Sequence, residues 1–124
     1  MLAVIDKIIF TNCQRNWRQI GQETGDNSLE KFLELLWGPL PDIGFEFTSE
    51  KQGTQTQFHV TQCSMYALAK TLGAEKWLYH LVCLTDEPSV VGFNADVKFD
   101  RTKTLMQGHT YCDHCYTERS TESR

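Results

Sequence analysis

Apolar residues recur at intervals of three and four over residues 2–20, where they form one stripe of a helix. This spacing predicts an amphipathic helix that ends at Gly21 and Gly25. The same period returns over residues 29–37, and Asn27 with a glutamate three positions later has the pattern of a helix N-terminus. Two helices are therefore expected before the first proline.

The apolar pattern then changes to a period of two. Residues 45–50 and 54–61 are rich in Phe, Thr and Val and are separated by a short segment with a glycine, which predicts an antiparallel hairpin. Helical spacing resumes after Cys63 and ends at Gly73. Residues 75–84 are apolar on almost every side, and periodicity alone does not separate a buried helix from a core strand there.

The last part of the chain predicts a short helix over residues 86–92 and a second hairpin formed by residues 97–105 and 111–117. The resulting order is helices, hairpin, helices, hairpin. It predicts a single α+β domain over residues 1–117, with an antiparallel sheet of about four strands, arranged as two hairpins, and helices packed on one face. The polar tail, residues 118–124, is expected to be disordered.

Length and charge exclude several classes of protein. The chain has 124 residues, which is the size of one domain. Sixteen acidic and twelve basic residues give a net charge of −4, which argues against a nucleic-acid binder. No apolar run approaches the ~20 residues of a membrane span. The five cysteines are an odd number without framework spacing, which favours reduced thiols and a cytoplasmic location.

Cys63 is the cysteine whose local setting points to reactivity. It lies where the strand pattern gives way to the helical one, so its side chain is expected at the N-cap of a helix. The unpaired backbone N–H groups and the helix dipole would lower the pKa of a thiol there, and the thiolate is the nucleophilic form. The alternative is a small buried residue at the boundary between two elements.

A second group of candidates lies in the sequence YCDHCY near the end of the chain. If this segment is extended, Cys112 and His114 face one side and Asp113 and Cys115 face the other. A site on this strand would then use one of these pairs and not both thiols together. The Cys-x-x-Cys spacing also occurs in zinc sites, but a structural zinc site usually needs two such pairs.

Several motifs follow one another in the C-terminal half. A cysteine opens a helix that ends in Leu-Gly, a Gly-Phe-Asn turn follows, and a strand with Arg-Thr-x-Thr-Leu-Met leads through a glycine to Cys-Asp. The residues of these motifs are Cys63, Leu72, Gly73, Gly92, Phe93, Asn94, Arg101, Thr102, Thr104, Leu105, Met106, Gly108, Cys112 and Asp113. Over about residues 27–117 the chain resembles the L-2-amino-thiazoline-4-carboxylic acid hydrolase family. The pattern is also similar to 4-vinyl reductase-type small-molecule-binding domains, which implies a ligand pocket between sheet and helices.

The resemblance implies a hydrolase that opens a five-membered cyclic amidine-thioether carrying a carboxylate. Cys63 or Cys112 would attack the amidine carbon, and Asp113 or His114 would move protons as the ring nitrogen or sulfur leaves. The residues expected to bind the substrate carboxylate are Arg101, Thr102, Thr104 and Asn94. No cofactor is expected. In a metal-assisted version zinc would activate water, held by Cys63, Cys112 and His114.

Two other functions remain open. The family pattern has a glutamate after the first cysteine and a histidine before the second, and their absence here favours a non-catalytic domain that binds or senses a small carboxylate. A zinc-stabilised interaction module on Cys112 and Cys115 is the third reading. The partners expected are thus a small-molecule carboxylate and, because the first helix needs a surface to cover its apolar stripe, a second copy of the chain in a homodimer.

Overall fold

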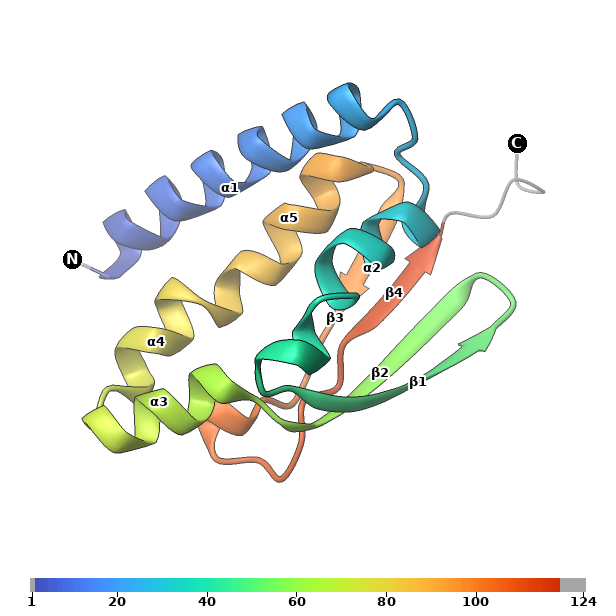
Figure 1. Cartoon of the computed structure of the whole chain (residues 1–124). Helices are drawn as coiled ribbons and strands as arrows, with labels where there is room; N and C mark the ends of the chain where they lie inside the picture. Colours follow the sequence, from blue (N-terminus) through green and yellow to red (C-terminus); the bar gives the residue numbers. More distant parts are fainter. Residues whose placement is uncertain (1, 119–124) are drawn as a thin grey trace.

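The computed structural model describes residues 2–118 and has the predicted α+β architecture (Figure 1). Its helices are α1 (Leu2–Thr24), α2 (Leu29–Trp37), α3 (Ser64–Leu72), α4 (Glu75–Leu81) and α5 (Asp86–Phe93). Its strands are β1 (Glu46–Gln52), β2 (Gln55–Gln62), β3 (Val97–Asp100) and β4 (Cys115–Glu118). Short 3-10 turns are η1 (Leu40–Ile43), η2 (Cys83–Thr85) and η3 (Leu105–Gln107).

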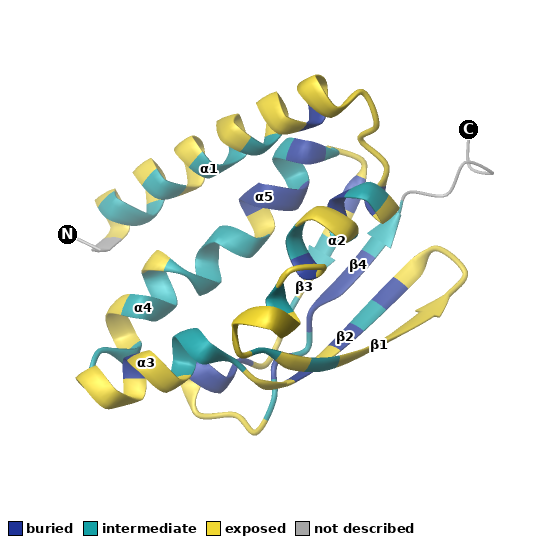
Figure 2. Cartoon of the chain, viewed as in Figure 1, coloured by how far each residue is buried: buried dark blue, intermediate teal, exposed yellow. Residues whose placement is uncertain are grey.

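The four strands form one antiparallel sheet in the order β1-β2-β4-β3. The two hairpins therefore join through β2 and β4, where Thr56 pairs with Tyr116. Along β2, Phe58 and Val60 are buried whereas His59 between them is exposed. Figure 2 shows buried residues along α5, β2 and β4, while β1 is mostly exposed. The helices cover one face of the sheet, as predicted.

Aromatic side chains fix α2 against this face. Trp37 stacks on Phe58 with ring centroids 4.0 Å apart, and its indole N–H donates a hydrogen bond of 3.2 Å to the hydroxyl of Tyr116. Phe32 and Tyr116 are fully buried and their rings lie 5.8 Å apart. Because these large side chains lose most of their contact with water, they dominate the stability of the core.

The long helix α1 lies alongside α5 (Figure 1). Gly92 allows this close approach, since a Cβ there would lie only 2.2 Å from the carbonyl oxygen of Gln14. Trp17 packs edge-on against Phe32 and Phe93, at 5.0 and 5.9 Å between centroids. Ile5, Ile9, Cys13 and Trp17 of the predicted apolar stripe are thus half-buried within the chain, whereas Ile20 is exposed, and the homodimer stays a prediction.

Some local predictions were wrong at the ends of elements. Helix α1 continues through Gly21, but it ends at Thr24, immediately before Gly25, as the second glycine predicted. The N-cap of α2 is Ser28, whose hydroxyl accepts a hydrogen bond from the backbone N–H of Lys31, and not Asn27. The ambiguous segment 75–84 forms α4 and the start of η2. None of the helices between residues 2 and 118 combines the length and apolar character that a membrane span requires.

The second hairpin is shorter than predicted, because β3 ends at Asp100 and β4 begins at Cys115. Residues 101–104 have no regular secondary structure, and Asp113 holds them by accepting hydrogen bonds from the backbone N–H groups of Thr102 and Lys103. Glu118, predicted as part of the tail, is the last residue of β4. The rest of the predicted tail, residues 119–124, lies outside the described residues.

Candidate functional site

A cavity of about 270 Å³ opens between the helical layer and the sheet. Part of its wall is apolar and comes from α2, η1, β2, α3 and the segment after α4. The other part carries three thiols and a group of polar side chains. We call it the thiol cavity after its polar lining, which comprises Cys63, Cys83, Cys112, Thr85, Asp86, Arg101, Thr104 and His114.

Cys63 occupies the N-cap of α3, as predicted, with extended backbone angles φ −136° and ψ 116°. The expected lowering of its pKa is wrong. Burial raises the pKa of the thiol, and the backbone N–H groups of Tyr66 and Met65 offset this only in part. Desolvation outweighs the helix terminus because the side chain packs against the hydrophobic core. Cys63 is therefore a protonated thiol at neutral pH.

Cys112 reaches the same cavity from a segment almost fifty residues further along the chain. Its backbone bridges to Val60 through two hydrogen bonds of 3.0 Å, and its Sγ accepts a 3.2 Å hydrogen bond from the backbone N–H of Leu105. Burial raises the pKa of this thiol, and the nearby Cys63 raises it further. The two sulfurs are close enough to influence each other electrostatically.

His114 lies two residues beyond Cys112 and lines the same cavity, as the alternation of an extended segment predicts. Its side chain is 9% exposed, and its Nδ1 has no hydrogen-bond partner among the described residues. That nitrogen lies 3.7 Å from Oδ2 of Asp86. Burial lowers the pKa of His114, although the charge of Asp86 acts in the opposite direction. The imidazole is therefore neutral at neutral pH and can accept a proton.

Arg101 and Asp86 form an ion pair in the wall of the cavity. Their side chains are 7% and 23% exposed. Burial lowers the pKa of Arg101, but the negative charge of Asp86 outweighs burial and leaves this pKa raised. Asp86 begins α5 and holds Arg101 beside the cavity, a role that the sequence did not reveal because the two residues are brought together only by the fold.

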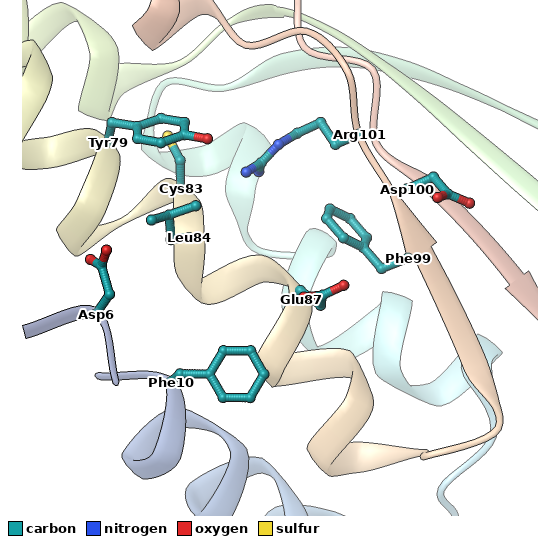
Figure 3. Close-up of a pocket in the computed structure, with 9 residues that line it drawn as sticks. All are labelled: Asp6, Phe10, Tyr79, Cys83, Leu84, Glu87, Phe99, Asp100 and Arg101. Carbon is teal, nitrogen blue, oxygen red and sulfur yellow. The ribbon is translucent and has the colours of Figure 1, made fainter. Parts of the chain in front are cut away.

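Cys83 is a third thiol of the cavity, and the sequence analysis did not single it out. Burial raises its pKa to about 12. Cys83 and Arg101 also line a second hollow of about 370 Å³, so the two spaces share a wall. Figure 3 shows this hollow, with Arg101 pointing toward Tyr79 and Cys83. The second hollow also carries three acidic side chains, Asp6, Glu87 and Asp100.

Three predicted site residues lie outside the thiol cavity. Asp113 accepts hydrogen bonds from the backbone N–H groups of Thr102, at 2.9 Å, and Lys103, at 2.7 Å. Burial raises its pKa, but these bonds outweigh burial and leave the pKa lowered. The hydroxyl of Thr102 is also bound to this carboxylate. Asn94 donates to the carbonyl oxygen of Asn27 at the end of α5. These groups hold loops in place and do not contribute to the cavity wall.

The predicted metal sets are not assembled in the described part of the chain. No three His, Cys, Asp or Glu side chains between residues 2 and 118 are grouped so that they could hold a metal ion. Cys115 accepts a 2.8 Å hydrogen bond from the side chain of Gln55, and it does not line the cavity that contains Cys112. The Cys-x-x-Cys spacing therefore does not bring its two thiols into one site.

Fold and site define a small α+β domain with a cavity lined by thiols, a neutral imidazole and a buried guanidinium. The sequence model of the L-2-amino-thiazoline-4-carboxylic acid hydrolase family matches residues 1–116. The chain belongs to this family, as its motifs predicted. No curated protein and no solved structure matches the chain.

Proposed function

We propose that the chain is a cysteine-dependent hydrolase that opens a small cyclic amidine-thioether carrying a carboxylate. The observation that supports this most directly is that Cys63 and Cys112, distant in sequence, line one cavity together with His114 and Arg101. A thiol, a base and a cation in one cavity are the groups that such a reaction needs. Membership of the hydrolase family points to the same chemistry.

The first step is activation of a thiol. Both candidate thiols have raised pKa values and are protonated at neutral pH, so a base must accept the proton as sulfur attacks. His114 is neutral and suits this role. The sulfur of Cys63 or Cys112 forms a bond to the amidine carbon, and the ring C–N or C–S bond then breaks as the imidazolium returns its proton to the leaving atom. Water finally adds to the same carbon and expels the cysteine sulfur.

Arg101 orients the carboxylate of the substrate in this scheme. One of its N–H groups is bound to Asp86, and a guanidinium has five N–H donors, which leaves donors for a second carboxylate. Because the side chain is almost fully buried, this interaction would be shielded from water and correspondingly strong. Thr104 lies in the same wall, but its hydroxyl is hydrogen-bonded to Gln107.

The test is turnover of L-2-amino-thiazoline-4-carboxylate by the purified protein, followed by mass spectrometry. We expect Cys63→Ser or Cys112→Ser to lower kcat by at least about 10³-fold, according to which sulfur attacks. Cys115→Ser is the matched control, because this thiol follows His114 in the chain but does not line the cavity. Full activity in both cavity variants would contradict covalent catalysis by Cys63 or Cys112.

A second candidate is a binding domain without catalysis. It is favoured by the raised pKa values of the cavity thiols, since none of them is a thiolate at neutral pH. This function predicts that a small carboxylate raises the melting temperature of the protein while no thiazoline acid is consumed. Consumption of the thiazoline acid above the rate of a heat-denatured sample would reject it.

A further inference from the structure

The thiol cavity has an apolar part that a small thiazoline carboxylate would leave unused. Its polar lining comes from the N-terminus of α3, η2, the start of α5 and the segment 101–114. The apolar lining comes mostly from one stretch of chain, residues 36–45, which contributes Leu36, Trp37, Leu40, Ile43 and Phe45. A ligand in this space therefore meets both polar groups and hydrocarbon, and the two parts of the wall adjoin at Trp37, whose ring packs edge-on against His114 with centroids 5.0 Å apart.

The volume of the cavity supports the same conclusion. An apolar cavity of about 150 Å³ accommodates benzene, and the thiol cavity measures about 270 Å³. One five-membered ring with a carboxylate would leave room for a further ring or a short alkyl group. Ligand pockets bind chiefly by removing apolar surface from water. A ligand that leaves the apolar side chains of the cavity uncovered would therefore bind more weakly than one that covers them.

The polar part of the cavity fixes which end of the ligand lies there. His114 is nine-tenths buried, and its Nδ1 has no hydrogen-bond partner among the described residues. Beside it, Arg101 carries a positive charge that only Asp86 neutralises in the same wall. A ligand whose N–H and carboxylate groups lie at this end would provide the imidazole and the guanidinium with partners, and its remaining atoms would face residues 36–45.

We propose that the natural ligand of this cavity is a cyclic amidine-thioether extended by an apolar ring or alkyl group. This inference rests on the proposed function for the choice of polar head group. The apolar extension is inferred from the lining of the cavity alone. The extended ligand would place its amidine beside the thiols and His114, and its apolar group against Leu40 and Ile43.

The experiment compares 2-aminothiazole with 2-aminobenzothiazole by isothermal titration calorimetry at pH 8. Both probes carry the same amidine-thioether, and they differ by one fused benzene ring. We expect the benzothiazole to bind at least about tenfold more tightly, because the added ring is removed from water. A gain of less than about tenfold, or no binding of either probe, would overturn the proposal.

A pair of variants tests where the added ring lies. Ile43 lines the cavity and is 59% exposed, so Ile43→Ser should fold normally. It should weaken binding of the benzothiazole about threefold and leave the thiazole unaffected. Ile8→Ser is the control, since Ile8 is 56% exposed on α1 and does not line the cavity. Equal effects of the two substitutions would overturn the placement of the apolar group.

The two proposals fail separately. A preference for the benzothiazole that depends on Ile43, without turnover of the thiazoline acid, would support the apolar ligand and reject the hydrolase. Turnover of the thiazoline acid together with equal affinity for the two probes would support the hydrolase and reject the apolar extension.

Discussion

Replacing Asp86 by asparagine tests the ion pair on which the polar part of the cavity is built. The carboxylate of Asp86 is the ion-pair partner of Arg101, whose side chain is only 7% exposed. Asp86→Asn keeps the shape of the side chain but leaves a buried guanidinium without its counter-charge. Breaking a fully buried pair costs about 3–5 kcal/mol. Because Asp86 itself is 23% exposed, we expect the lower figure of about 2–3 kcal/mol.

Urea unfolding followed by circular dichroism measures this loss. A domain of this size is stable by roughly 5–15 kcal/mol, so the variant should remain folded in water. The matched control is Asp100→Asn, since Asp100 pairs with Lys98 at 3.7 Å and both side chains are mostly exposed. The control should change the free energy of unfolding by less than about 0.5 kcal/mol.

A double variant separates the ion pair from the packing around it. Adding Arg101→Met to Asp86→Asn removes the unpaired charge, so the double variant should be less destabilised than the sum of the single variants. The reasoning is refuted if Asp86→Asn costs no more than Asp100→Asn, or if the effects of the two cavity substitutions simply add.

Three further predictions concern other parts of the molecule. Gly92→Ala should destabilise the protein by about 3 kcal/mol or more, because its Cβ would meet the carbonyl oxygen of Gln14; an unchanged melting temperature would contradict this. Alkylation of Cys83 by iodoacetamide, followed by peptide mass spectrometry, should still accelerate above pH 10, because its pKa is about 12; a plateau near pH 8 would contradict it. Asp113 has a lowered pKa in the folded protein, so its stabilising effect is complete above about pH 4, the unfolded pKa, and is lost as the pH falls through the folded pKa. The stability difference between wild type and Asp113→Asn should therefore shrink in acid, and a constant difference in unfolding experiments from pH 6 to pH 2 would refute the assignment.

Local sequence patterns were sufficient to place two parts of the site. The change from strand to helical period put Cys63 at a helix N-terminus, and the alternation of an extended segment put Cys112 and His114 on one side. Both predictions depend only on neighbouring residues. For the same reason the first hairpin and the helices other than α4 were predicted with small errors at their ends, whereas the segment that forms α4 was left open between helix and strand.

The parts that the sequence did not reveal depend on tertiary contacts. Cys83 and Asp86 reach the cavity because α4 and α5 pack beside the segment that carries Arg101. The pKa of Cys63 could not be predicted from its helix terminus, because the burial that raises it comes from distant residues. The end of β3 was misplaced for a similar reason, since the backbone N–H groups of Thr102 and Lys103 donate to the side chain of Asp113 and not to a neighbouring strand.

The rate at which the double variant Cys63→Ser/Cys112→Ser consumes L-2-amino-thiazoline-4-carboxylate is the measurement that bears most directly on the proposed chemistry. Both sulfurs of the candidate nucleophiles are then absent, whichever of them attacks. We predict a rate at least about 10³-fold below that of the wild type, with an unchanged circular dichroism spectrum. Consumption at the wild-type rate would show that neither sulfur takes part in the reaction.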